Sequence, residues 1–202
     1  MPILDPQQSY TFSKIFELKI QPKDLAQELG YSLKRDWLNL PQYTGELDRL
    51  EERKARIQEV LPYVDLANEQ TRREFLIAPI VLDLIHYTKS EVRIEYPIKV
   101  TQQLQGSLDY LIEAQNNLLV IEAKQEDLNY GLTQLVAEMI ALAQFKNTAK
   151  LNPFIGAVTT GNIWQFCRLY PTEKHLEQGL NLYRVPDDLD PLLRILVQAL
   201  IS

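Results

Sequence analysis

Three ionisable residues, Asp109, Glu122 and Lys124, interrupt two stretches that otherwise have the composition of buried β-strands. These stretches, residues 108–114 and 118–123, are rich in Leu, Ile, Val and Tyr. Buried charges are costly unless they are paired, hydrogen-bonded or bound to a metal. Two carboxylates and an ammonium in such strands are therefore expected to be paired, hydrogen-bonded or bound to a metal.

The segment between the two stretches predicts a tight turn. Asn116 and Asn117 suit a two-residue β-hairpin, because asparagine tolerates positive φ angles. The turn would place Gln115 opposite Leu118 and fix the register of the antiparallel pair. The register matters because a shift of one residue would move every side chain to the other face.

In this register Asp109 lies opposite Lys124, and Glu122 lies on the diagonal. Side chains alternate between the faces of a strand, so all three point the same way. The other face is almost wholly apolar, and we expect it to pack on a core. Its residues are Leu108, Tyr110, Ile112, Ala114, Leu119, Ile121 and Ala123.

Two neighbouring carboxylates repel each other unless a cation is present. Hard oxygen ligands on a rigid hairpin suit Mg²⁺, which usually keeps several waters for chemistry. A nearby lysine can orient a water or stabilise an anionic transition state. The combination predicts metal-assisted phosphodiester hydrolysis. The alternative is a structural pair between Asp109 and Lys124, with Glu122 at a solvated edge.

These residues resemble the motif of the PD-(D/E)xK nuclease superfamily, which has the restriction endonuclease-like fold. In that family an acidic residue begins one strand and E-x-K follows on the next, here Asp109, then Glu122, Ala123 and Lys124. The resemblance implies that Asp109, Glu122 and the main-chain carbonyl of Ala123 hold Mg²⁺ or Mn²⁺. It also implies that Lys124 positions the attacking water or stabilises the pentacovalent phosphate.

The resemblance covers about residues 68–170 and extends to the helices around the hairpin. A glutamate-bearing helix often precedes the strands, and Glu74 is the candidate; it is either linked to the metal or solvated. A glutamine on the following helix often faces the site, which makes Gln134 an accessory catalytic residue. Gln134 lies one turn before Glu138, and the two either sit over the hairpin or lie on the surface.

The sequence departs from the family pattern at two positions. Leu108 replaces the proline of the motif name, which is a common relaxation. Glu138 stands where the exonuclease branch has the tyrosine of its Q-x-x-x-Y signature. The second departure disfavours a RecB-like exonuclease.

The composition is that of an ordinary globular protein. The chain has 202 residues, a net charge of −6 and one cysteine, Cys167, so no disulfide can form within it. The absence of a signal-peptide pattern and of a long apolar run predicts a cytoplasmic protein with no membrane segment. Basic residues concentrate in the first third but alternate with acidic ones; they form either a solvated helix face or a strip that follows a phosphate backbone.

The periodicity predicts an α/β fold with a mixed central β-sheet flanked by helices, a restriction endonuclease-like core and an N-terminal helical arm. Residues 1–67 form the arm, mostly helical and packed on the core, and residues 68–202 form the core with its C-terminal helix. Helices are expected at 22–29, 43–61, from Asn68 or Thr71 to about 87, at 131–146 and after Pro186. Strands are expected within 10–20, at 91–100, in the hairpin, and at 154–159, 163–169 and 180–185.

The predicted function is that of a metal-dependent nuclease, and the resemblance implies that it acts on DNA. The alternative is a catalytically inactive nuclease-fold module that binds nucleic acid or protein. A homodimer, and a partner protein that supplies specificity, are compatible with both functions.

Overall fold

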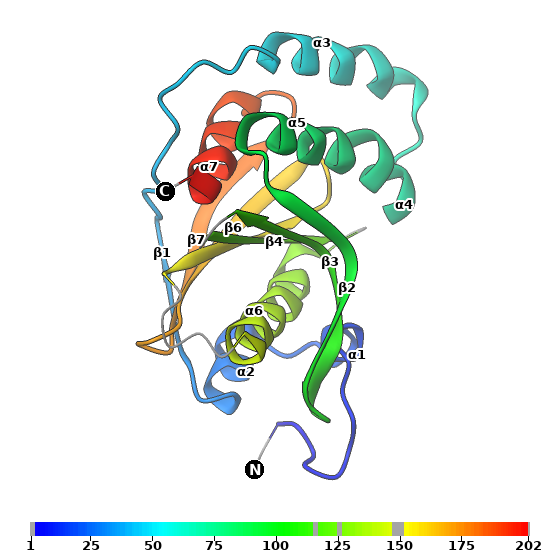
Figure 1. Cartoon of the computed structure of the whole chain (residues 1–202). Helices are drawn as coiled ribbons and strands as arrows, with labels where there is room; N and C mark the ends of the chain where they lie inside the picture. Colours follow the sequence, from blue (N-terminus) through cyan, green and yellow to red (C-terminus); the bar gives the residue numbers. More distant parts are fainter. Residues whose placement is uncertain (1–2, 115–116, 125–126, 147–151, 202) are drawn as a thin grey trace.

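The fold is built on one open β-sheet of seven strands, seen in a computed structural model that describes residues 3–114, 117–124, 127–146 and 152–201 (Figure 1). The strand order is β1-β7-β6-β5-β4-β3-β2. The strands are β1 (Ser32–Asp36), β2 (Glu91–Thr101), β3 (Leu104–Ala114), β4 (Asn117–Ala123), β5 (Phe154–Thr159), β6 (Ile163–Tyr170) and β7 (His175–Arg184).

The sheet is mixed, which confirms the predicted fold class. β1 runs parallel to β7 and β4 runs parallel to β5, whereas the other neighbours are antiparallel. A parallel neighbour requires a crossover, and α6 (Leu128–Phe145) provides it between β4 and β5. This β4–α6–β5 unit brings the end of the E-x-K strand directly under the start of a helix.

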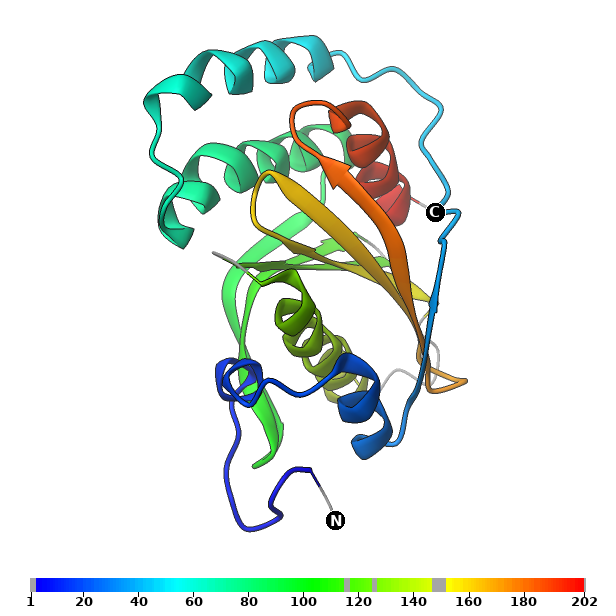
Figure 2. The same cartoon turned by 180° about the vertical axis from the view of Figure 1, so that it is seen from behind.

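Helices cover both faces of the sheet (Figures 1 and 2). On one face α6 packs with α1 (Phe12–Glu17) and α2 (Pro22–Glu28). On the other face lie α3 (Leu50–Val60), α5 (Ala78–Thr88) and α7 (Leu189–Ile201). Three short elements complete the described fold: a 3₁₀ turn, η1 (Leu61–Tyr63), the helix α4 (Glu69–Arg72) and a π-helical segment, η2 (Arg73–Ile77).

The hairpin strands are buried on both sides. Tyr110, Ile112 and Ile121 belong to the core beneath α5 and α7, as predicted for the apolar face. Leu108, predicted for the same face, belongs instead to the core beneath α6. Leu111 and Val120 point the other way and belong to the core beneath α6. The sequence of a strand covered on both faces is a continuous apolar run rather than an alternating one. The three charged residues are therefore exceptions within apolar strands.

The predicted hairpin register is wrong by two residues. Ala114 pairs with Asn117 and Tyr110 with Ile121, so Asn117 begins β4 and is not a turn residue. Gln115 and Asn116, the rest of the predicted turn, lie outside the described residues. Because the shift is an even number, each side chain keeps its face, and Asp109 comes level with Glu122 instead of Lys124.

The N-terminal segment differs from the predicted arm. The expected strand within residues 10–20 is wrong, because α1 begins there after Thr11, whose hydroxyl accepts from the Lys14 N–H. The segment does contain α1, α2 and α3, but its β1 also joins the central sheet beside β7. α3 begins at Leu50, seven residues after the predicted start of the helix.

The single helix predicted from Asn68 or Thr71 to about residue 87 is divided. The Asn68 side chain caps α4, and the π-helical η2 precedes α5. Pro79 lies in the first turn of α5, where its missing N–H costs least. Pro97 lies in β2, which is an edge strand, the position in a sheet where a proline is tolerated.

The predicted helix 131–146 corresponds to α6, and the C-terminal helix to α7. The last predicted strand is longer than expected, since β7 starts at His175. None of the helices in the described ranges is long and apolar enough to cross a membrane.

Candidate active site

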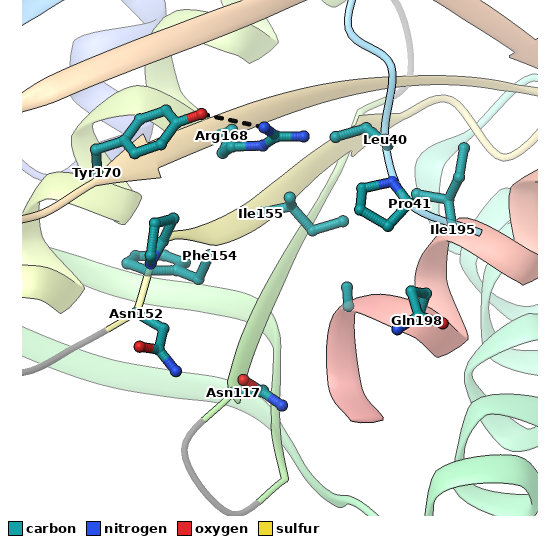
Figure 3. Close-up of a pocket in the computed structure, with 12 residues that line it drawn as sticks. Leu40, Pro41, Asn117, Asn152, Phe154, Ile155, Arg168, Tyr170, Ile195 and Gln198 are labelled. Carbon is teal, nitrogen blue, oxygen red and sulfur yellow. Dashed lines mark hydrogen bonds between the residues drawn. The ribbon is translucent and has the colours of Figure 1, made fainter. Parts of the chain in front are cut away.

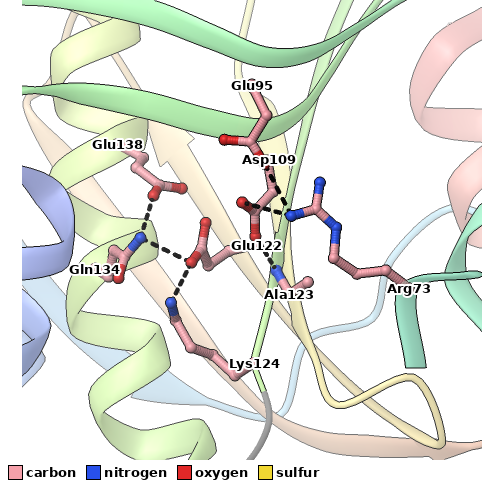
Figure 4. A network of polar contacts seen from close by, with 8 residues as sticks. All are labelled: Arg73, Glu95, Asp109, Glu122, Ala123, Lys124, Gln134 and Glu138. Atoms are coloured by element: carbon pink, nitrogen blue, oxygen red, sulfur yellow. Dashed lines mark hydrogen bonds and ion pairs between the residues drawn. The ribbon is translucent and has the colours of Figure 1, made fainter. Parts of the chain in front are cut away.

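The structure brings the four predicted catalytic residues together at the end of β4 (Figure 4). Asp109 lies on β3, Glu122 on β4, Lys124 directly after β4, and Gln134 on α6. Lys124 Nζ lies 2.5 Å from Glu122 Oε1. The predicted charged cluster therefore forms, although with a different hairpin register.

Gln134 joins Glu122 to a second buried carboxyl group. Its Nε2 donates to Glu122 Oε1 at 2.7 Å and to Glu138 Oε1 at 2.8 Å. Only 1% of Glu122 and none of Glu138 is exposed. Gln134 and Glu138 therefore lie over the hairpin and not on the surface, the other position considered for them.

Asp109 is held by the backbone of the neighbouring strand. The Ala123 N–H donates to Asp109 Oδ2 at 2.8 Å. The N–H and C=O of a strand residue point to the same neighbouring strand, so the Ala123 carbonyl, the predicted main-chain metal ligand, is on the Asp109 side. On the side of Asp109 away from Gln134, Arg73 Nη1 lies 3.5 Å from Oδ1 (Figure 4).

The position of Lys124 depends on two close neighbours. A Cβ atom on Gly131 would come within 2.9 Å of Lys124 Cγ, so the glycine allows the lysine stem to pass close to α6. The ammonium lies 4.8 Å from the centre of the Phe16 ring, a cation–π distance. Phe16 belongs to α1, so the N-terminal segment forms part of the site.

Burial controls the electrostatics of the carboxyl groups. It raises the pKa of Glu122, and the Asp109 charge raises it further. Burial also raises the pKa of Glu138, with Glu122 as the next cause. The pKa of Asp109 is raised by burial as well, although its hydrogen bond from Ala123 and the Arg73 charge oppose the rise.

Lys124 stays protonated in this environment. Burial alone would lower the pKa of its ammonium, but the combined attraction of Glu122, Glu138 and Asp109 outweighs burial and the pKa is raised. Three carboxyl groups thus share one close ammonium. A proton between Glu122 and Glu138, or a bound cation, would relieve the repulsion that remains.

Three buried oxygen atoms at the site have no hydrogen-bond partner among the described residues: Glu122 Oε2, Glu138 Oε2 and Gln134 Oε1. Unpartnered buried oxygens are costly, and hard oxygen donors are the preferred ligands of Mg²⁺. By chemical type these atoms suit a divalent cation. As the side chains stand, however, no group of three or more His, Cys, Asp or Glu in the described chain is arranged to hold a metal ion.

Glu74, the fourth predicted metal residue, is not part of this network. It is exposed on η2 and lines a surface pocket with Glu69 and Arg73. Glu69 is the carboxyl group of this region that interacts electrostatically with the site: burial raises its pKa, while Lys124 lowers it and Asp109 raises it.

Sequence reasoning did not assign three residues that the network contains. Glu138 had a usable signal, since it is a charged residue four positions after Gln134 in an otherwise apolar helix. Arg73 and Glu95 had none, because they come from η2 and β2 and meet Asp109 only in the folded chain. Arg73 Nη1 lies 2.8 Å from Glu95 Oε1.

A separate cavity of about 350 Å³ lies away from this site (Figure 3). It opens between the sheet and α7, beside Asn117 and Phe154, the first residues of β4 and β5. The candidate site lies at the other end of β4. Arg168 donates to the Tyr170 hydroxyl at 3.0 Å in the wall of this cavity.

No protein-family model, curated protein or solved structure matches the chain. The similarity to PD-(D/E)xK nucleases therefore remains a prediction from the motif. The seven-stranded mixed sheet and the side-chain cluster are observed in the structure and do not depend on that similarity.

Proposed function

We infer that this chain is a metal-dependent nuclease that hydrolyses phosphodiester bonds in DNA. One observation carries the proposal: Asp109, Glu122, Lys124 and Gln134 converge at the end of one strand, with buried carboxylate oxygens left unpartnered. If the cluster were only a structural ion pair, we would expect its buried oxygens to have hydrogen-bond donors, because unsatisfied polar atoms are rare in native proteins.

Asp109, Glu122 and the Ala123 carbonyl would hold Mg²⁺ or Mn²⁺, with the free oxygen of Glu138 close by. The ion would supply Lewis acidity to a phosphoryl oxygen and lower the pKa of a bound water. Lys124, kept protonated by Glu122, would stabilise the negative charge that develops on the phosphate. Gln134 would keep the Glu122 carboxylate oriented through its hydrogen bond.

DNA as the substrate rests on the resemblance of the motif. The cytoplasmic location remains a prediction from the sequence pattern, and a homodimer and a partner protein that supplies specificity are compatible with the proposed function. The net charge of −6 means that a DNA-binding surface would be local rather than global.

The test is digestion of single-stranded, duplex and branched DNA by the purified protein with Mg²⁺, Mn²⁺ or EDTA. We expect cleavage with either metal and none with EDTA. Asp109→Asn and Lys124→Ala should each lower the rate by roughly a hundredfold or more, since each removes a charged group at the reacting phosphate.

Matched controls are Asp187→Asn and Lys23→Ala, which change exposed residues outside the site. They should cleave at the wild-type rate. Circular dichroism should show that all four variants are folded. Metal-dependent cleavage that persists in both Asp109→Asn and Lys124→Ala would rule out the proposed site.

A second candidate is a catalytically inactive module of the same fold. The ion pairs of Glu122 with Lys124 and of Asp109 with Arg73 favour it, because they compensate the carboxylates without a metal. Calorimetric titration with Mg²⁺ and Mn²⁺ separates the two candidates. Absence of binding by folded protein would support the module, and saturable binding lost in Asp109→Asn would support the nuclease.

A further inference from the structure

Arg73 occupies a junction between the candidate metal site and the surface. Its Nη1 contacts Glu95 at 2.8 Å and Asp109 at 3.5 Å, and its guanidinium carbon lies 5.2 Å from the centre of the Tyr110 ring. Its side chain is 19% exposed. A guanidinium has five N–H donors, so it can bind acceptors beyond these two carboxylates.

Two unusual backbone features converge on this arginine. Arg73 is the first residue of η2, and π-helical turns are rare and often occur at functional sites. Glu95 has a φ of +51° within β2, a conformation that is unfavourable for residues other than glycine. Such strain of about 1–3 kcal/mol persists where the surroundings impose it, commonly at functional sites.

A pocket of about 420 Å³ lies on the outer side of Arg73. Its wall includes Glu69, Gln70, Ile94 and Tyr110, and Ile94 is 59% exposed on the edge strand β2. Arg73 therefore faces Asp109 on one side and an open, partly apolar pocket on the other.

We propose that Arg73 binds a backbone phosphate of the nucleic-acid substrate at this pocket, next to the candidate metal site. The proposal rests on the proposed function and names a binding residue for it. Arginine matches phosphate oxygens with two parallel N–H donors, which a point charge such as lysine cannot do. The side chain is already held in place by Glu95, so little conformational freedom is lost when the phosphate binds.

The entering phosphate would take the place of Asp109 at the guanidinium. Without substrate, Asp109 and Glu95 compensate the guanidinium. A cation held by Asp109 would compete for that carboxylate, and the phosphate would then replace Asp109 as an acceptor of Arg73. Glu95 would remain as its second acceptor. No covalent step is involved.

The test is equilibrium binding of a fluorescein-labelled single-stranded oligonucleotide, followed by anisotropy in buffer with Ca²⁺ in place of Mg²⁺ and again in EDTA. The variants are Arg73→Met and Arg73→Lys. The control is Arg93→Met, which removes the same charge from β2 at the ion pairs with Glu91 and Glu113, outside the pocket.

Loss of a charge-assisted contact should make Arg73→Met bind roughly ten- to a hundredfold more weakly than wild type. The slope of log K against log salt should fall by about 0.7, the value for one lost phosphate contact on a single strand. Arg73→Lys should lie between wild type and Arg73→Met, and Arg93→Met should match wild type.

Equal affinity and salt slope in wild type and Arg73→Met would overturn the proposal, as would a wild-type protein that binds no oligonucleotide under either condition. Thermal melts establish that the variants are folded; if Arg73→Met is not folded, the affinities of Arg73→Lys and Arg93→Met are compared instead.

Binding that depends on Arg73 without any cleavage would support the phosphate site and rule out the nuclease. Cleavage that depends on Asp109 but not on Arg73 would support the nuclease and rule out the phosphate site.

Discussion

At the scale of single residues, the buried carboxyl pair depends on Gln134. One nitrogen of this side chain donates to both Glu122 and Glu138. Hydrogen bonds to charged or partly charged groups contribute about 1.5–3 kcal/mol each, and loss of a donor leaves the acceptor desolvated.

We therefore expect Gln134→Leu to lower the free energy of unfolding by about 3–6 kcal/mol in metal-free protein, from the loss of two such bonds. Urea unfolding followed by circular dichroism measures it. Gln58→Leu makes the same change at an exposed position of α3 and should have little effect. Equal stability of the two variants would mean that the network does not stabilise the fold.

At the scale of elements, α3 is joined to α5 by an ion pair. Ile57 is its one buried residue. Arg53 makes two bonds to Asp83 of α5, from Nε at 2.7 Å and from Nη2 at 3.0 Å, and Asp83 is fully buried. A buried ion pair is costly to break from one side, because the remaining charge loses its partner.

Asp83→Asn should therefore lower the free energy of unfolding by about 2–4 kcal/mol, somewhat less than for a fully buried pair because Arg53 keeps 19% exposure. Denaturant unfolding gives the value, and hydrogen exchange should show faster opening of α3. The control is Glu52→Gln, which breaks an exposed pair with Arg56 and should change stability little. An Asp83→Asn protein as stable as this control would contradict the role of the pair.

At the scale of the whole molecule, the site couples stability to pH and to divalent cations. The folded-state pKa values of Glu122 and Glu138 are raised, chiefly by burial. A group with a raised pKa binds its proton more tightly in the folded state, so its stabilising effect is complete below the unfolded pKa and is lost as pH rises through the folded pKa.

Metal-free protein should accordingly lose stability between about pH 5 and pH 9, by about 1.4 kcal/mol for each unit by which a pKa is raised. Mg²⁺ at a hundred times its Kd should restore about 2.7 kcal/mol, with the larger effect at high pH, where protons no longer compete for the carboxylates. Urea unfolding at pH 5, 7 and 9, with Mg²⁺ or EDTA, measures both effects.

Glu138→Gln is the control for this linkage, since a neutral amide cannot titrate. It should flatten the pH dependence in EDTA relative to wild type. Parallel curves for the two proteins would show that the buried carboxyl pair is not the source of the dependence.

Much of the fold was predictable because the strands have strong local signals. The hairpin and the strands β5 and β6 are short apolar runs bounded by polar or turn residues. The predicted register was wrong by two residues, but Asp109 still lies beside the E-x-K motif because an even shift keeps each side chain on its face. The expected strand within residues 10–20 was wrong because burial of Phe12 and Ile15 against α6, three residues apart, favours a helical turn there.

The sequence by itself determined the mixed α/β class and the shared face of Asp109, Glu122 and Lys124, since alternation along a strand is a local property of the backbone. Only the tertiary structure decided that Glu138 lies in the cluster and Glu74 does not, and that Arg73 and Glu95 close around Asp109. These positions depend on how distant helices and an edge strand pack on the sheet, and no spacing along the chain encodes a distance between segments that meet only after folding.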